Sequence, residues 1–257
     1  MFFPISDDDR KVSTTAFVTY ALLVANVLLF LVQLNDPDFT YGWSVIPQEI
    51  STGVDLVETQ LVQVDGHGTL EIPQAPGPSI LWLTLLTSMF MHGGFGHIAG
   101  NMLYLWIFGN NVEHRFGHFW FLIFYVTAGL VGSFAQIMVN PNSVIPNLGA
   151  SGAIAGVMGA YLVLFPRNRI NAIFLYYIIT VPAIVVLGMW IAMQFVSGVG
   201  SIAATSESAG GVAYLAHVGG FVAGVVAGLC CRMTLPNEPD SMLKRQYLRD
   251  PKSHRWW

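Results

Sequence analysis

Long apolar segments alternate with short polar ones along most of this chain. A helix that crosses a bilayer needs about 20 mostly apolar residues, and six segments approach that length, at residues 16–34, 97–111, 118–139, 149–166, 170–197 and 212–231. Another apolar stretch, at 80–91, lies within the longer segment 35–96 and is a candidate for a seventh span. Of the 257 residues, 54% are hydrophobic and 10% are charged, whereas soluble domains carry about 25% charged residues. The pattern therefore predicts an all-α membrane protein.

The basic residues decide between six and seven spans, because cytoplasmic loops are enriched in Lys and Arg. With six spans and a cytoplasmic N-terminus, all eleven basic residues fall on the cytoplasmic side: Arg10, Lys11, Arg115, Arg167, Arg169, Arg232, Lys244, Arg245, Arg249, Lys252 and Arg255. Counting 80–91 as a span would move nine of them outside. We therefore predict six spans with both termini in the cytoplasm. The parts are a cytoplasmic N-terminal segment (1–15), a membrane domain (16–231) with an outer loop at 35–96, and a basic cytoplasmic tail (232–257).

Four polar residues of three predicted spans share one depth near the outer face. Ser151 lies near the outer end of the fourth span, and His217 lies about one and a half turns into the sixth. His97 and Asn101 are four residues apart in the second span, so their side chains lie on one helix face. Ionisable groups inside a span are costly and indicate function.

Small residues recur every four positions in the fourth and sixth spans, at Gly152 and Gly156 and at Gly220, Gly224 and Gly228. This spacing lets membrane helices pack backbone to backbone. We infer that the two spans touch, which would bring Ser151 and His217 within hydrogen-bond reach. The alternative is that the glycines only pack helices and that each polar residue is satisfied locally.

The remaining histidines are expected to be interface, loop or tail residues rather than catalytic ones: His114, His118, His67 and His254. The spacing of His92, His97 and His217 matches no recognised zinc pattern. We therefore expect neither a metal nor another cofactor.

The shared layer contains the groups that nucleophilic catalysis requires. A serine becomes a nucleophile when a neighbouring base accepts its proton, and imidazole is suited to that role. The oxyanion formed by the attack needs donors already in place, and the candidates are the Asn101 amide, the His97 ring N–H and the backbone N–H of Ser151. Gly149 and Ala150 would line the site. No carboxylate lies in the outer half of a predicted span, so we predict a Ser–His dyad rather than a triad.

Three motifs resemble the rhomboid intramembrane serine proteases: "HGGFGHIAGN" at 92–101, "GASGA" at 149–153 and "AHVGGFVAG" at 216–224. The resemblance covers residues 80–231 and implies a six-helix rhomboid-like bundle. The chain departs from the family pattern at Ala155, where some members have an aromatic residue that stacks on the catalytic histidine. It also has Leu83 and Thr84, near Trp82, where the family often has a Trp-Arg pair.

The resemblance implies a role for each polar residue. Ser151 would be the nucleophile, and His217 the general base and then the general acid. His97 and Asn101, with the Ser151 amide, would form the oxyanion hole. His92 would lie in the loop that lines the site. The substrates would be transmembrane segments of other proteins, cut near the extracytoplasmic face.

The resemblance also implies a multi-pass protease of the cell membrane whose active site faces the extracytoplasmic side. Its partners would be transmembrane protein substrates and membrane lipids, with no nucleic acid. The fifth span would admit the substrate, and Pro182 is expected to kink it. Three alternatives stay open: a non-proteolytic rhomboid-fold protein that binds membrane clients, a small transporter or channel, and a metal site formed by His92, His97 and His217.

Overall fold

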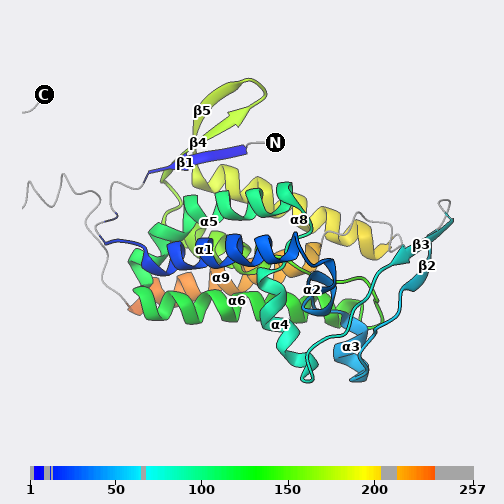
Figure 1. The fold of residues 1–257 in the computed structure, drawn as a ribbon. Helices are drawn as coiled ribbons and strands as arrows, with labels where there is room; N and C mark the ends of the chain where they lie inside the picture. The colour runs from blue at the N-terminus through cyan, green and yellow to red at the C-terminus, as the bar shows by residue number, and fades with distance from the viewer. Residues whose placement is uncertain (1–2, 9–11, 13, 65–67, 204–212, 235–257) are drawn as a thin grey trace, which may run out of the picture.

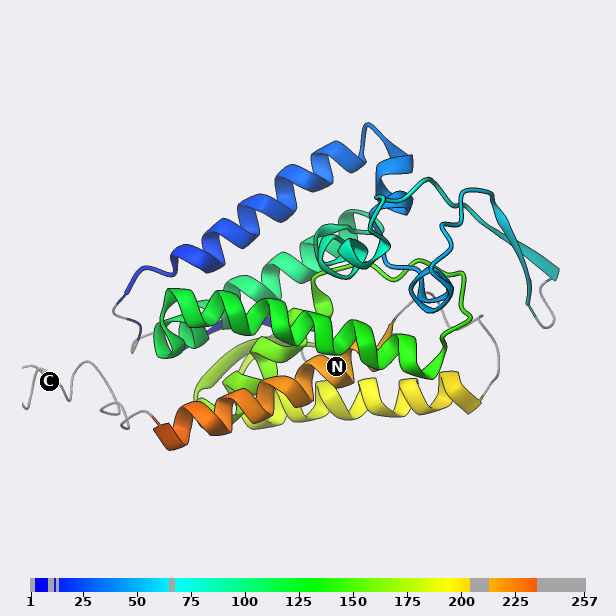
Figure 2. The same cartoon turned by 90° about the horizontal axis from the view of Figure 1, so that it is seen from below.

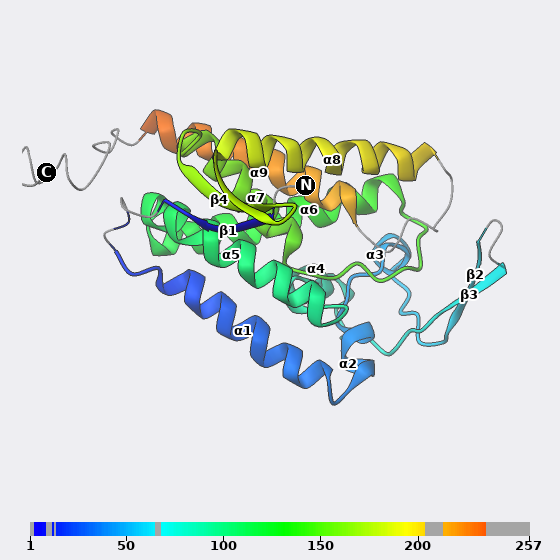
Figure 3. The same cartoon turned by 90° about the horizontal axis from the view of Figure 1, so that it is seen from above.

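The computed structural model describes residues 3–8, 12, 14–64, 68–203 and 213–234. Among these residues, six longer helices run roughly along one direction and form the body of the molecule (Figure 1): α1 (Phe17–Gln33), α5 (Phe95–Phe116), α6 (His118–Val139), α7 (Ser151–Leu164), α8 (Ala183–Ala203) and α9 (Tyr214–Thr234). Helices α1 and α8 lie at opposite edges of this bundle (Figures 2 and 3). Several residues discussed above lie outside the described part of the chain: Arg10, Lys11, His67, His254 and the tail beyond residue 234.

The helices differ in how well they match the thickness of a bilayer. By length and composition, α6 and α9 are each able to cross a membrane, whereas α1, α7 and the first part of α8 are apolar but shorter. Helix α5 has 22 residues and is more polar, because it carries His97, Asn101 and Glu113. The expected helix at 118–139 is confirmed, and the expected span at 97–111 is longer than predicted at both ends.

Helix α7 is the centre of the bundle. It contacts α5, α6, α8 and α9, and every residue from Gly152 to Tyr161 is buried. Small side chains make this possible, since a methyl group on Gly156 would lie 3.2 Å from the Gly220 carbonyl oxygen and would crowd Ala128 of α6 at 2.5 Å. The position of α7 fixes the position of its first residue, Ser151, which is half-buried at one end of this helix.

The predicted fifth span at 170–197 is wrong in its first part. Strands β4 (Arg169–Phe174) and β5 (Tyr177–Pro182) form an antiparallel hairpin there, and α8 begins only at Ala183. The segment is rich in β-branched and aromatic residues, which favour strands, and Leu175 forms the turn with φ 55°. Pro182 ends β5 and does not kink a helix. The uncharged apolar run at 170–197 therefore contains most of a β-hairpin followed by the first part of helix α8.

The N-terminal segment is part of this sheet. Strand β1 (Phe3–Asp7) pairs antiparallel with β4, giving the order β1-β4-β5. Asp7 also accepts a hydrogen bond from the hydroxyl of Tyr161 on α7, at 2.7 Å. The all-α expectation thus holds for the bundle but not for the segments outside it, which contain two small sheets.

The described residues of the segment 35–96 gather at the end of the bundle opposite the C-terminal end of α9 (Figure 1). Among its described residues the segment contains five small elements and two 3-10 turns: α2 (Pro37–Gly42), α3 (Pro47–Thr52), β2 (Gln60–Val64), β3 (Gly68–Ile72) and α4 (Thr84–Thr87), with turns at Leu81–Leu83 and Ser88–Phe90. The stretch at 80–91 is therefore a short, irregular helical segment and is not a full-length helix. Val45 and Asn147 exchange two backbone hydrogen bonds, and Gly149 donates its N–H to the Ser88 carbonyl at 2.8 Å. These bonds hold the chain that leads into Ser151.

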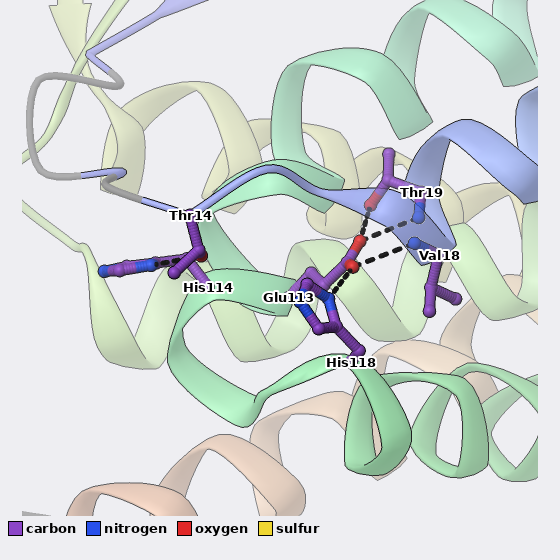
Figure 4. A network of polar contacts seen from close by, with 6 residues as sticks. All are labelled: Thr14, Val18, Thr19, Glu113, His114 and His118. Carbon is purple, nitrogen blue, oxygen red and sulfur yellow. Dashed lines mark hydrogen bonds and ion pairs between the residues drawn. The ribbon is translucent and has the colours of Figure 1, made fainter.

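A buried carboxylate joins three helices at the other end of the bundle (Figure 4). Glu113 of α5 accepts the backbone N–H groups of Val18 and Thr19 at 2.9 and 2.7 Å, and the Thr19 hydroxyl at 2.7 Å. Its other contact is His118 Nδ1 of α6, at 2.5 Å. The first amides of a helix have no partner within the helix, so Glu113 caps α1 from a neighbouring helix. His118 is thus part of an internal network, and His114 contacts the Thr14 hydroxyl at 2.8 Å.

Candidate active site

Ser151 and His217 meet at the N-terminal ends of α7 and α9. Ser151 is the first residue of α7, and His217 lies in the first turn of α9. His217 Nε2 lies 2.7 Å from Ser151 Oγ, although 66 residues separate them in the sequence. The contact expected from the glycine spacing is therefore present, and it has the length of a hydrogen bond.

Two side chains of α8 hold the other side of the His217 ring. Gln194 Oε1 lies 2.7 Å from His217 Nδ1, and the Trp190 ring packs on the imidazole with centroids 5.7 Å apart. Neither residue was predicted from the sequence to belong to the site. A signal was present, because Gln194 is the one amide side chain in the apolar run from Ala183 to Ala203. These contacts orient the His217 ring, which Ala155 cannot do because it has no aromatic ring to stack on the imidazole.

Gly149 brings the candidate oxyanion donors next to Ser151. Its φ of +122° suits glycine, and a side chain there would lie 2.8 Å from His97 Nε2 and 3.6 Å from Asn101 Nδ2. His97 Nδ1 accepts the Gly93 N–H at 3.2 Å, which leaves the proton of a neutral ring on Nε2. Asn101 Nδ2 is buried and has no hydrogen-bond partner among the described residues. Both side chains thus offer an N–H beside the serine.

A cavity of about 490 Å³ opens over these groups. Its polar wall is formed by four residues, His97, Asn101, Ser151 and His217, and its apolar wall includes Tyr104, Ile154, Met158 and Trp190. The walls come from α5, α7, α8 and α9. The cavity can therefore take an apolar chain with its backbone against the serine.

The chain matches the family model described as Rhomboid domain over residues 81–234, more than half of its length. The chain belongs to the rhomboid family. It is therefore an α-helical membrane protein of a family that includes named proteases.

Three curated relatives support the assignment of this rhomboid protein. It is 38% identical over 151 residues to Rhomboid protease GluP of Bacillus subtilis, an alignment that covers 58% of this chain and 26% of that protein. Rhomboid protein 1, mitochondrial, of Saccharomyces cerevisiae is 33% identical over 151 residues, covering 57% and 41%. The human Presenilin-associated rhomboid-like protein, mitochondrial, is 34% identical over 102 residues, covering 39% and 27%. The alignments thus span between about a quarter and two fifths of the relatives' own lengths.

His92 of this rhomboid protein lies behind the site rather than in the cavity wall. It is 2% exposed, and its backbone N–H and C=O both bond to the Gln33 side chain of α1, at 3.0 and 3.1 Å. Its ring contacts the His97 ring with centroids 5.2 Å apart. Burial, and then the nearby His97, lowers the pKa of His92 to about 4. His92 is thus a neutral support for His97, and its partner Gln33 was not predicted from the sequence.

The two expected lining residues differ in position. Gly149 borders a second, smaller cavity of about 30 Å³ behind Ser151, which Ser133 and Gln136 of α6 also line. Ala150 is fully buried and lies in the wall of neither cavity. The Gln136 Oε1 atom has no partner among the described residues, and the volume is sufficient for at least one water.

A metal site receives no support from the described part of this rhomboid protein. No group of three or more His, Cys, Asp or Glu side chains there is arranged to hold a metal ion. His217 is instead engaged by Ser151 and Gln194 on its two ring nitrogens. The described geometry therefore favours a nucleophile and a base over a ligand set.

Proposed function

We propose that this rhomboid protein is an intramembrane serine endopeptidase with Ser151 as the nucleophile and His217 as the general base. The observation that carries the proposal is the 2.7 Å contact between Ser151 Oγ and His217 Nε2. Beside it in the cavity wall is Asn101, whose Nδ2 atom has no partner in the part of the chain that the structure describes. A non-proteolytic rhomboid protein would have no need for these three groups together.

The proposed reaction proceeds through two tetrahedral intermediates. Ser151 Oγ attacks the scissile carbonyl carbon while its proton passes to His217 Nε2. The carbonyl electrons move to the oxygen, which accepts hydrogen bonds from Asn101 Nδ2, His97 Nε2 and the Ser151 amide. His217 then protonates the leaving nitrogen, the C–N bond breaks, and an acyl-enzyme forms. Water attacks this ester and gives its proton to His217, which returns it to Ser151 as the second intermediate collapses.

The depth of Ser151 supports a site inside the membrane. Helix α7 has 14 residues and is about 21 Å long, whereas the hydrocarbon core is about 30 Å thick. A methyl group on Gly152 would lie 3.9 Å from the Gly129 carbonyl of α6, and α6 continues for ten residues beyond Gly129. The serine therefore lies about 15 Å below the outer end of α6. Water reaches it from the cavity, and the space beside Gln136 is a reservoir close to the reacting atoms.

The proposed topology takes α1 and α5 to α9 as six spans, with both termini in the cytoplasm of a cell and the active site toward the outside of its membrane. Arg115 and Arg232 lie at the C-terminal ends of α5 and α9, and Arg167 and Arg169 follow α7. These cations gather at one end of the bundle, which the positive-inside rule assigns to the cytoplasm. Residues 1–15 and 232–257 are then cytoplasmic flanks of a membrane domain at 16–231.

The proposed substrates are transmembrane segments of other membrane proteins, and lipid is the surrounding partner. The cavity lies between the outer parts of α5 and α8, with Tyr104 on one side and Trp190 on the other. A substrate helix enters sideways between these two helices and unwinds so that its backbone reaches Ser151. Helix α8 is the gate in this proposal.

The test compares purified wild type, Ser151→Ala and His217→Ala on a model single-span substrate and with a fluorophosphonate probe. We expect cleavage only by the wild type, and no probe labelling of Ser151→Ala. The control is Thr127→Ala, because the Thr127 hydroxyl of α6 is exposed and bonds only to the Ile123 carbonyl among the described residues. Cleavage by Ser151→Ala at the wild-type rate would remove the protease assignment. A wild type that binds the substrate without cutting it would favour a client-binding protein.

A further inference from the structure

We propose that Gln194 of α8 is the positioning residue that sets the tautomer and orientation of His217. The inference rests on the proposed protease function, and it adds a third member to the predicted dyad. It also makes the state of the site depend on the position of α8.

The two contacts of the His217 ring define its tautomer. A glutamine Oε1 atom can only accept a hydrogen bond, so the Oε1–Nδ1 contact of 2.7 Å places the proton on Nδ1. Nε2 then keeps its lone pair toward Ser151 Oγ, at 2.7 Å. In the opposite tautomer Nε2 would carry a proton and would not accept the serine proton. The Gln194 carbonyl thus selects the ring form that can act as a base.

An amide suits this buried position better than a charged acceptor. His217 is 9% exposed, and burying an isolated carboxylate costs far more than burying a hydrogen-bonded amide. The hydrogen bond from Nδ1 to this neutral acceptor also becomes stronger when the ring is charged, because hydrogen bonds to ionised groups are stronger. Gln194 therefore supports the imidazolium that forms when Ser151 attacks.

The positioning groups form one stripe on α8. Trp190, Gln194 and Gly198 are four residues apart, so they share one helix face. Trp190 and Gln194 contact His217, and a methyl group on Gly198 would lie 3.3 Å from Tyr214 Cβ in the first turn of α9. The small residue at 198 allows α8 to approach α9 closely enough for the Gln194 contact. Moving α8 away from α9 removes the acceptor from His217.

The first experiment replaces the acceptor. Gln194→Met keeps the length of the side chain and removes the carbonyl, and we expect kcat to fall about tenfold with KM unchanged, as for loss of one buried hydrogen bond. Gln194→Glu keeps an acceptor oxygen in either ionisation state, and we expect it to stay within about threefold of the wild-type kcat. The matched control is Phe195→Met, since Phe195 is 59% exposed. A wild-type kcat in Gln194→Met would overturn the proposal. A kcat in Gln194→Glu as low as that in Gln194→Met would also overturn it.

The second experiment moves the helix without changing the acceptor. Gly198→Val crowds α9 and is expected to lower kcat by a similar factor. Gly188→Val is its control, because a side chain at 188 meets nothing within 4 Å. Equal kcat values in the two variants would overturn the dependence on α8.

A spectroscopic measurement keeps the inference separate from the protease assignment. In protein labelled with ¹⁵N-histidine, the His217 signals are assigned by their absence in His217→Ala. We expect a protonated Nδ1 and an unprotonated Nε2 in the wild type, and a shifted or mixed tautomer in Gln194→Met. This result does not depend on cleavage. Absence of cleavage by every variant would count against the protease, whereas an unchanged tautomer in Gln194→Met would count against the role of Gln194.

Discussion

Gly224 of α9 lies directly against the backbone of Gly156 of α7. A methyl group on Gly224 would overlap the Gly156 carbonyl oxygen, and one on Gly220 would overlap the Gly152 carbonyl oxygen in the same way. The two helices therefore touch through their main chains along two successive turns. This contact determines the distance between Ser151 and His217, which lie at the ends of the same two helices.

Enlarging Gly224 is expected to separate α7 from α9. Gly224→Val places a Cβ atom 1.9 Å from the Gly156 carbonyl oxygen and adds two methyl groups to it, and the clash is with backbone rather than with a flexible side chain that could move away. We expect a loss of about 3 kcal/mol or more in the free energy of unfolding, at the upper end for overpacked sites, together with loss of cleavage. Thermal unfolding in detergent measures the first effect. Gly188→Val should unfold at the wild-type temperature, and equal destabilisation of both variants would contradict the argument.

Asn101→Ala is expected to reduce kcat about 10²-fold with little change in KM. Asn101 Nδ2 has no partner among the described residues, so its removal breaks no hydrogen bond of that nitrogen with them and is expected to act through the oxyanion. The measurement is steady-state cleavage, with unfolding temperature as the check on structure. Asn110→Ala on the same helix is the control, because Asn110 lies two and a half turns away from Asn101. A large rise in KM with unchanged kcat would assign Asn101 to substrate binding instead.

Much of the bundle was predictable because membrane helices are read from long apolar runs. Helix α6 has the predicted bounds, and the glycine spacing predicted that α7 and α9 touch. That Ser151 and His217 lie at the same end of α7 and α9 followed from counting residues along two predicted spans. These inferences need only helix geometry and the small size of glycine.

The hairpin β4–β5 and the partners of His217 were not predictable in the same way. Length and apolarity do not separate a strand pair from the start of a span, so residues 170–182 were assigned to a helix. Gln194 and His217 are 23 residues apart on different helices, and their pairing depends on how α8 rotates against α9. The amide in an apolar run was still a usable signal, since such a group requires a partner.

Glu113 is expected to be a determinant of stability rather than of catalysis. It accepts three hydrogen bonds from Val18 and Thr19 and contacts His118, and its side chain is fully buried. Glu113→Ala leaves several donors without a partner, so we expect a loss of about 2–4 kcal/mol in the free energy of unfolding. Denaturation in mixed micelles measures it. Glu58→Ala, at an exposed position, should have no effect, and a Glu113→Ala protein as stable as the wild type would contradict this account.

The last prediction concerns Glu49 of α3, whose surroundings disfavour the charged form of its carboxyl group. Glu49 is 2% exposed and accepts the Leu56 N–H at 2.9 Å, while Asp55 nearby accepts the Gly77 N–H. Burial, and to a smaller extent Asp55, raises the pKa of Glu49 from 4.5 to about 7. The folded protein therefore binds a proton more tightly at Glu49 than the unfolded chain does.

A raised pKa in the folded state makes the loop more stable at low pH. The protonated carboxyl contributes its full stability below pH 4.5, and this contribution is lost as the pH rises through about 7. We expect the free energy of unfolding of the loop to fall by up to about 3 kcal/mol across that range. Hydrogen exchange of the amides of α3 between pH 5 and pH 8, corrected for the intrinsic rate, measures it. Glu49→Gln should abolish the pH dependence and match the protonated wild type, whereas Glu58→Gln should retain it; a wild-type loop that gains protection toward pH 8 would reverse the sign and refute the assignment.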